Sequence, residues 1–294
     1  MRRFPYVLLD VFTSRPLEGN QLAVFTDARG LSNSEMQRLA KETNLSETTF
    51  ILPRDEAMER DRGVQVRIFT VEEELPFAGH PTLGTAFCLR GNSGKQTIEL
   101  DLKVGKIPVS FEDRPDGPAF AEMRQRDLEF GQIHDRVIVA AIAGLVPEDF
   151  RDDLPIQTVS TGMPFAIAPV SSLACMQSMK LNRSAAEEYL RTSDAKFFYF
   201  ICTETVDKQA RLHARMIFYN GEDPATGSAA GCCAAWMAKY GVAQPDERVM
   251  IEQGLEINRP SQIFVRAGRA GAKVADVRVG GHAVEVARGE FLLP

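Results

Sequence analysis

The stretch EDPATGSAAGCCAAWMA, residues 222–238, decides the fold, because a polar turn with glycine opens directly into a run of small and apolar residues. A helix that is apolar on every side is buried on every side. Its first turn carries backbone N–H groups without intrahelical partners, so that turn must lie inside the protein too. The stretch predicts a buried helix over residues 225–239 whose start needs a hydrogen-bond acceptor.

A related pattern occurs earlier, in VRIFTVEEELPFAGHPTLGTAF at residues 66–87. In both stretches a strand with an arginine is followed by an acidic link, a glycine turn and a small, apolar helix. Gly79 lies 12 residues after Arg67, and Gly227 lies 12 residues after Arg215. Upstream, GNQLAVF at 19–25 matches GMPFAIA at 162–168. Short strand–turn–helix units can coincide by chance, but several landmarks in one order favour an internal repeat.

Between these landmarks each half has an amphipathic helix and then a β-rich run, at residues 48–52 and 197–201. The first helix has clear signals: a capping box of Ser32 and Glu35, a left-handed stop at Asn44, and an inward stripe of Met36, Leu39 and Ala40. The predicted class is α+β, with two pseudo-symmetric domains. Each domain wraps a curved, mostly antiparallel sheet around one central buried helix, at residues 81–90 and 225–239.

The domain boundary is expected in the polar segment after the strand AFAEMRQ, so that the domains cover residues 1–126 and 127–294. The last strand could return to the first domain.

Composition is that of a globular protein of 294 residues, 44% hydrophobic and 25% charged, with a net charge of −6. This charge favours neither nucleic acid nor an anionic membrane as a partner, so a small molecule is expected. No apolar stretch reaches the roughly 18 residues of a membrane helix. The five cysteines lack CxxC spacing, which favours reduced thiols and a cytoplasmic protein, and the four histidines show no metal-ligand spacing. We expect no metal and no cofactor.

The two glycine turns suggest the chemistry. Gly79 precedes His80, and Gly227 lies between Thr226 and Ser228, so each buried helix starts where backbone can approach a ligand. A helix start offers N–H donors and a positive dipole end, which suit a small carboxylate. The alternative is that the side chains of His80, Thr82, Thr226 or Ser228 simply cap these helices.

A proton carrier is also needed, and Glu47 in NLSETTFIL is the best candidate. It lies where a helix gives way to an apolar strand, so partial burial could raise its pKa toward neutrality. The alternative is a surface residue at the start of a strand. The second half has no matching acid, since Lys196 lies near the equivalent place. His80 could bind a substrate carboxylate or share a proton with Asp223, which alone would be an ordinary helix cap.

Two residues are weaker candidates. Glu74 is the one member of its acidic link that we expect to face a cleft, and Asn20, after Gly19, is a turn residue that could contact ligand.

At these residues the chain resembles the PhzF family of phenazine-biosynthesis-like isomerases, which share the diaminopimelate epimerase fold. The matching segments span nearly the whole chain: DVFTSRPLEGNQLAVF, NLSETTFI, FTVEEELPFAGHPTLGTAF, VSTGMPF and EDPATGSA. The resemblance implies two pseudo-symmetric halves, a site in the cleft between them, and commonly a homodimer.

The resemblance also implies residue roles. The glutamate of the segment matching NLSET shuttles the proton, which here is Glu47. His80, Asp223 and Ser228 complete the site, and the turns at Gly79 and Gly227, with Thr226 beside the latter, hold the substrate carboxylate. Related epimerases use two cysteines as bases, and neither turn contains one.

The chain departs from the family pattern at Val71, where proline is frequent, and in the short link Tyr219-Asn220-Gly221, which bears on substrate identity. The hypothesis is a cofactor-independent isomerase that moves a proton within a small unsaturated carboxylic acid, of the dihydro-hydroxyanthranilate isomerase type. Two alternatives stay open: an amino- or hydroxy-acid epimerase or racemase without cysteine bases, and a non-catalytic module for ligand binding or protein interaction.

Overall fold

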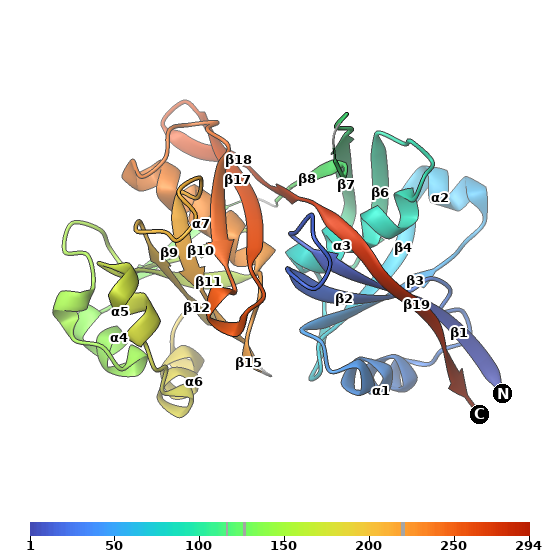
Figure 1. Ribbon diagram of the computed structural model, residues 1–294, viewed down its shortest axis with the longest axis horizontal. Coiled ribbons are helices and arrows are strands. Elements are labelled where there is room, and N and C mark those ends of the chain that lie inside the picture. The colour runs from blue at the N-terminus through green and yellow to red at the C-terminus, as the bar shows by residue number, and fades with distance from the viewer. Residues whose placement is uncertain (116, 126–127, 219–220) are drawn as a thin grey trace. The chain divides into compact units, whose positions relative to one another are not determined.

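The computed structural model describes residues 1–115, 117–125, 128–218 and 221–294, and the chain divides into two compact units. Unit 1 comprises Met1–Arg124 and Gly280–Pro294, and unit 2 comprises Gln125–Val279. The boundary expected between residues 126 and 127 falls outside the described residues. The last strand, β19 (Ala283–Leu293), pairs antiparallel with β1 (Arg2–Val11) in unit 1 (Figure 1).

Unit 1 is a curved sheet in which parallel and antiparallel pairs alternate. β1 pairs antiparallel with β2 (Asn20–Phe25), and β2 pairs parallel with β3 (Glu47–Leu52). β3 pairs antiparallel with β4 (Val64–Phe69), β4 parallel with β6 (Thr97–Leu102), and β6 antiparallel with β7 (Gly105–Glu112). β5 (Glu74–Leu75) joins β4, and β8 (Phe120–Arg124) joins β7. The helices are α1 (Asn33–Thr43), α2 (Glu56–Arg62) and α3 (Gly79–Arg90).

Unit 2 repeats this alternation. β10 (Gln157–Ser160) pairs antiparallel with β11 (Pro164–Pro169), β11 parallel with β12 (Phe197–Cys202), and β12 antiparallel with β13 (Leu212–Arg215). β13 then pairs parallel with β16 (Val249–Gln253), and β16 antiparallel with β17 (Ser261–Ala270). The same order of pairings in both units confirms the predicted α+β class and its pseudo-symmetry.

The remaining elements of unit 2 surround this frame. β9 (Glu129–Ile133) pairs with β10, and β14 (Ile217–Phe218) forms a short hairpin with β15 (Gly221–Glu222). The helices are α4 (Arg136–Ala143), α5 (Leu173–Ser178), α6 (Arg183–Thr192) and α7 (Gly227–Tyr240), with 3-10 turns at Pro147–Asp149 and Leu255–Ile257. β18 (Lys273–Gly281) precedes β19.

One buried helix lies at the centre of each unit. α3 contacts β1, β2, β6 and β8, and α7 contacts β10, β11 and β17. Helix α3 starts two residues earlier than predicted and α7 two residues later, each at the glycine itself. Gly84 lets α3 approach the sheet, because a Cβ there would lie 2.6 Å from Leu22 and 2.7 Å from Val11. The all-round apolar sequences are therefore explained by burial on every side.

The outer helix of unit 1 confirms its predicted signals. Ser32 caps α1 in a capping box with Glu35, and Asn44 ends the helix with φ 53°. Strand β3 separates α1 from α3, because alternate residues face opposite sides. Phe50 stacks on Phe25 in the cluster under α1, whereas Thr49 accepts a hydrogen bond from Thr85 of α3 at 2.9 Å. Across the described residues, no helix combines the length and apolar character required to cross a membrane.

Candidate active site

Glu47 and His80 form the chemically most suggestive pair of unit 1. The His80 Nδ1 lies 3.1 Å from Glu47 Oε2, and the two side chains are 3% and 10% exposed. On the other edge of the ring, His80 Nε2 lies 3.3 Å from the Gln21 carbonyl oxygen. The sequence alone offers Asp223 as a proton partner for His80; within unit 1 that partner is Glu47.

The local fold explains this pairing. Glu47 begins β3 and lies two residues before Thr49, so its side chain points to the same face of the sheet, toward α3. His80 is the second residue of α3 and is buried in its first turn. The strand and the helix start are each fixed by core packing, which holds the carboxylate against the imidazole.

In unit 2 the turn before α7 is held by Gln253, the last residue of β16. Its Nε2 donates to the Asp223 carbonyl at 2.8 Å and to Thr226 Oγ1 at 3.0 Å. Its Oε1 accepts from the Thr226 backbone N–H and from the Tyr199 hydroxyl, both at 3.1 Å. Thr226 Oγ1 in turn donates to Asp223 Oδ2 at 2.6 Å. The fully buried Gln253 amide thus fixes both the backbone and the side chains of this turn.

Neither central helix is capped by the side chain of its own cap residue. The residues at the cap positions, Ala78 of α3 and Thr226 of α7, make no side-chain cap within the described chain. Thr82 donates to the Ala78 carbonyl instead, at 2.6 Å. Asp223 is not a cap either, since α7 begins at Gly227.

In each unit, a glutamate of the acidic link before the central helix forms an ion pair with the arginine of the preceding strand. Arg67 and Glu74 form a double hydrogen bond at 2.8 and 2.7 Å, and Arg215 and Glu222 form one at 2.8 Å for both contacts. Burial acts to raise the pKa of Glu74, but Arg67 and Lys103 together lower it. The structure gives Glu74 two cationic partners, and its place at a cleft stays a prediction.

The register of the strands shows what unit 2 has in place of Glu47. Leu22 lies opposite Glu47 in the β2–β3 pair, and Phe165 lies opposite Phe197 in the β11–β12 pair. Phe197, one residue after the expected Lys196, therefore occupies the matching position.

The other predicted site residues are also buried. Ser228 follows Gly227 in the first turn of α7, and Asn20 opens β2 at 1% exposure. Among the described residues, no cluster of His, Cys, Asp or Glu is arranged to hold a metal ion. The link Tyr219-Asn220-Gly221 falls partly outside the described residues, at Tyr219 and Asn220. Sequence reasoning missed Gln253, whose signal is a polar pair and a glycine, EQG, ending an apolar strand.

Comparison with known proteins gives a consistent picture. A family model described as phenazine biosynthesis-like protein matches residues 9–289. A protein of Mesorhizobium japonicum named as an uncharacterized isomerase is 39% identical, with 98% of each chain covered. The trans-2,3-dihydro-3-hydroxyanthranilate isomerase of Pseudomonas aeruginosa is 34% identical over 98% of this chain and 99% of its own. A crystal structure of a PhzF-family protein from Bacillus anthracis superposes with a TM-score of 0.88 at 28% identity, covering both chains fully.

Proposed function

The chain belongs to the phenazine biosynthesis-like family, and we propose that it is a cofactor-independent isomerase that moves a proton within a small unsaturated carboxylic acid. The relatives named as isomerases, among them the dihydro-hydroxyanthranilate isomerase, support this reaction class and weigh against the non-catalytic alternative. The observation that carries the proposal is the buried pair of Glu47 and His80.

The pair is suited to proton transfer because it holds one proton that either partner can carry. The Gln21 carbonyl only accepts, so the His80 Nε2 that faces it must carry a hydrogen. Nδ1 then either accepts from a protonated Glu47 or, as imidazolium, donates to an ionised one. In the proposed reaction Glu47 takes the proton from one substrate carbon as that C–H bond breaks, and returns it to another carbon as the double bond shifts.

The starts of α3 and α7 are proposed to bind the substrate carboxylate. Gly79 and Gly227 begin these helices, the cap residues Ala78 and Thr226 make no side-chain cap, and a helix start attracts an anion. Asp223, Ser228 and Thr226 would hold polar groups of the substrate, with Asn20 as a further contact. The Gln253 contacts support this role, because they fix the turn before substrate arrives.

We also propose that the protein acts in the cytoplasm as a homodimer, with a small molecule rather than nucleic acid as its partner. Light scattering after size-exclusion chromatography tests the dimer, which predicts about twice the chain mass of 32.6 kDa.

The function is tested by NMR of the purified protein in D2O, without added cofactor, with dihydro-hydroxyanthranilate and a panel of small amino and unsaturated acids. We expect a carbon-bound proton signal to disappear with the wild type and to persist with Glu47→Gln. Glu42→Gln, at an exposed glutamate of α1, is the matched control and should behave as wild type. Turnover retained by Glu47→Gln would refute the assignment, and chiral analysis of the product would reveal an epimerase.

A further inference from the structure

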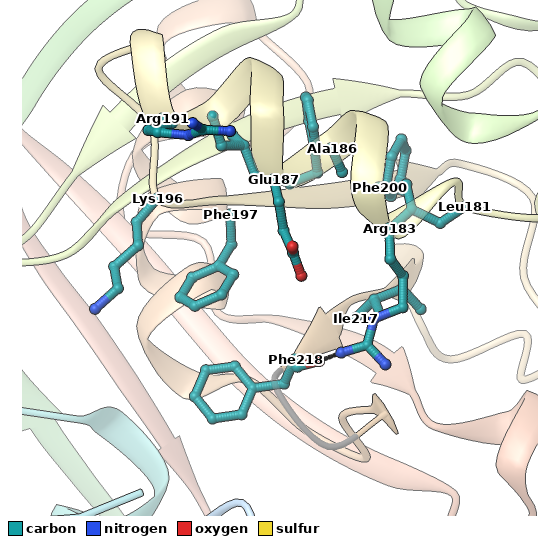
Figure 2. Close-up of a pocket in the computed structure, with 12 residues that line it drawn as sticks. Leu181, Arg183, Ala186, Glu187, Arg191, Lys196, Phe197, Phe200, Ile217 and Phe218 are labelled. Atoms are coloured by element: carbon teal, nitrogen blue, oxygen red, sulfur yellow. Dashed lines mark hydrogen bonds between the residues drawn. The ribbon is translucent and has the colours of Figure 1, made fainter. Parts of the chain in front are cut away.

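A pocket of about 280 Å³ opens within unit 2, between α6, β12 and β14 (Figure 2). Its walls are mainly apolar and aromatic, and three cationic residues and one acidic residue lie among them. None of the proposed catalytic residues lines it. The lining residues that matter here are Arg183, Ala186, Glu187, Lys196, Phe197 and Phe218.

The matching region of unit 1 explains why this pocket exists. Asn182 caps α6 as Ser32 caps α1, so Ala186 stands four residues after its cap where Met36 stands in α1. Both cap residues lie 15 residues before the matched strand positions Phe197 and Glu47, which confirms this register. Met36 is 2% exposed and fills the space under α1. Alanine lacks that side chain, so the space under α6 stays open.

The same register explains the acidic side chain in the pocket. In unit 1, Gln37 donates to the Thr70 carbonyl at 2.8 Å. The matched residue of α6 is Glu187, whose carboxylate cannot donate. The matched carbonyl, that of Phe218, instead accepts from Arg183 at 3.2 Å. Glu187 therefore does not make the hydrogen bond to the backbone that Gln37 makes in unit 1.

Glu187 is directed into the pocket. Figure 2 shows its carboxylate extending from α6 into the space that Phe197 and Phe218 border. Within the described part of the chain no ion pair or hydrogen bond involves this carboxylate. The rings of Phe197 and Phe218 pack 5.2 Å apart at 44°. A carboxylate beside aromatic rings is an arrangement that binds an ammonium group.

The cationic residues of the pocket favour a ligand that also carries a negatively charged group. Arg183, Arg191 and Lys196 lie along the pocket, and arginine suits carboxylates through paired hydrogen bonds. They outnumber the single acid, so a simple amine would be repelled, while a simple carboxylate would make no contact with Glu187. A ligand with both charges satisfies both sets.

We propose that this pocket binds a hydrophobic α-amino acid, with its ammonium at Glu187, its carboxylate toward Arg183 and its apolar side chain over Ala186. The volume suits a ligand of this size. This site goes beyond the proposed isomerase function and does not depend on it.

The test is isothermal titration of the full-length protein with L-phenylalanine. We expect saturable binding, and at least tenfold weaker binding of 3-phenylpropanoate, which lacks the ammonium, and of phenethylamine, which lacks the carboxylate. Glu187→Gln should weaken L-phenylalanine binding at least tenfold, whereas Glu188→Gln, an exposed neighbour outside the pocket, should not. Ala186→Met, which copies unit 1, should abolish binding.

Three results would overturn the proposal: no saturable binding by the wild type, equal binding of either analogue, or binding that Glu187→Gln leaves unchanged. Glu187 is exposed on α6, so this variant should fold and the test does not depend on the core variant. Repeating the titration with Glu47→Gln separates the two sites, because binding in the pocket should be unaffected.

Discussion

Units 1 and 2 share one order of strand pairing and one type of central helix, yet they differ at several matched positions. Glu47 in unit 1 corresponds to Phe197 in unit 2, and Met36 corresponds to Ala186. Unit 1 therefore has an acid and a filled space under its outer helix, whereas unit 2 has an apolar residue and a pocket. The frame fixes where a side chain points, and the residue placed there decides whether that position does chemistry, packs or binds.

The third difference lies at the last residues of two matched strands. Val64 pairs with Leu100, and Leu212 pairs with Ile251, so Leu102 in unit 1 corresponds to Gln253 in unit 2. Leu102 is a core residue, whereas Gln253 holds the turn before α7. At the start of the central helix in unit 1, the corresponding side-chain contact is that of His80 with Glu47. Different side chains therefore fix the start of the central helix in the two units. Replacing a residue of one unit by the residue at the matched position of the other tests its role.

Apart from the loss of turnover expected for Glu47→Gln, the largest effect is expected for His80→Gln. Glutamine can hydrogen-bond to Glu47 but cannot take up its proton, so kcat should fall about 1000-fold, or about 4 kcal/mol in barrier height. Steady-state kinetics across a pH series measures this. His282→Gln, at another buried histidine of unit 1, is the control and should keep most activity. A folded His80→Gln enzyme within threefold of wild type would show that the pair is structural.

A smaller effect, on stability, is expected for His213→Gln, which gives unit 2 the residue that unit 1 has at Gln65. His213 is buried, which acts to lower its pKa, but hydrogen bonds to Glu252 and Glu256 at 2.8 Å raise it to about 9. A raised histidine pKa stabilises the fold below the unfolded value near 6.5, and that contribution is lost as pH rises through about 9. At pH 6 the free energy of unfolding of His213→Gln should therefore be roughly 3 kcal/mol lower than that of wild type.

Urea unfolding at pH 6 and pH 10 measures this difference. The difference in free energy of unfolding between wild type and His213→Gln should be smaller at pH 10 than at pH 6. An equal difference at both pH values would show that a charged His213 does not stabilise the fold. His134 serves as a control of opposite sign, because burial lowers its pKa. Its replacement by Gln should lessen the loss of stability as pH falls below 6.5.

The smallest effect is expected for Gln253→Leu, which copies Leu102. It removes the donors to the Asp223 carbonyl and to Thr226 Oγ1, so the turn should lose its fixed geometry. We expect kcat to fall about 30-fold, or about 2 kcal/mol, with a smaller change in KM. Tyr199→Phe, which removes only the hydroxyl contact to Gln253, should reduce kcat less. Unchanged kcat in folded Gln253→Leu would refute the positioning role.

Much of this fold follows from local signals in the sequence. The capping box at Ser32, the stop at Asn44 and the twin glycine turns each act within a few residues, so they predict helices and the repeat. The contacts of His80 with Glu47 and of Gln253 with Thr226 join residues far apart in the chain. Such contacts depend on strand register, which no local pattern gives. The predicted start of α3 is two residues too late and that of α7 two residues too early, because Pro81 and Ala225 suit a first turn as well as the nearby glycines do.

The central claim is that unit 1 alone carries the proton. The most direct measurement is deuterium incorporation from D2O into each substrate carbon, followed by NMR with wild type, Glu47→Gln and Asp223→Asn. We expect Glu47→Gln to abolish incorporation at every carbon, whereas Asp223→Asn should slow it without changing which carbons exchange. Incorporation that persists at one carbon in Glu47→Gln and is lost there in Asp223→Asn would instead reveal two bases, Glu47 and Asp223, and would refute Glu47 as the single proton carrier.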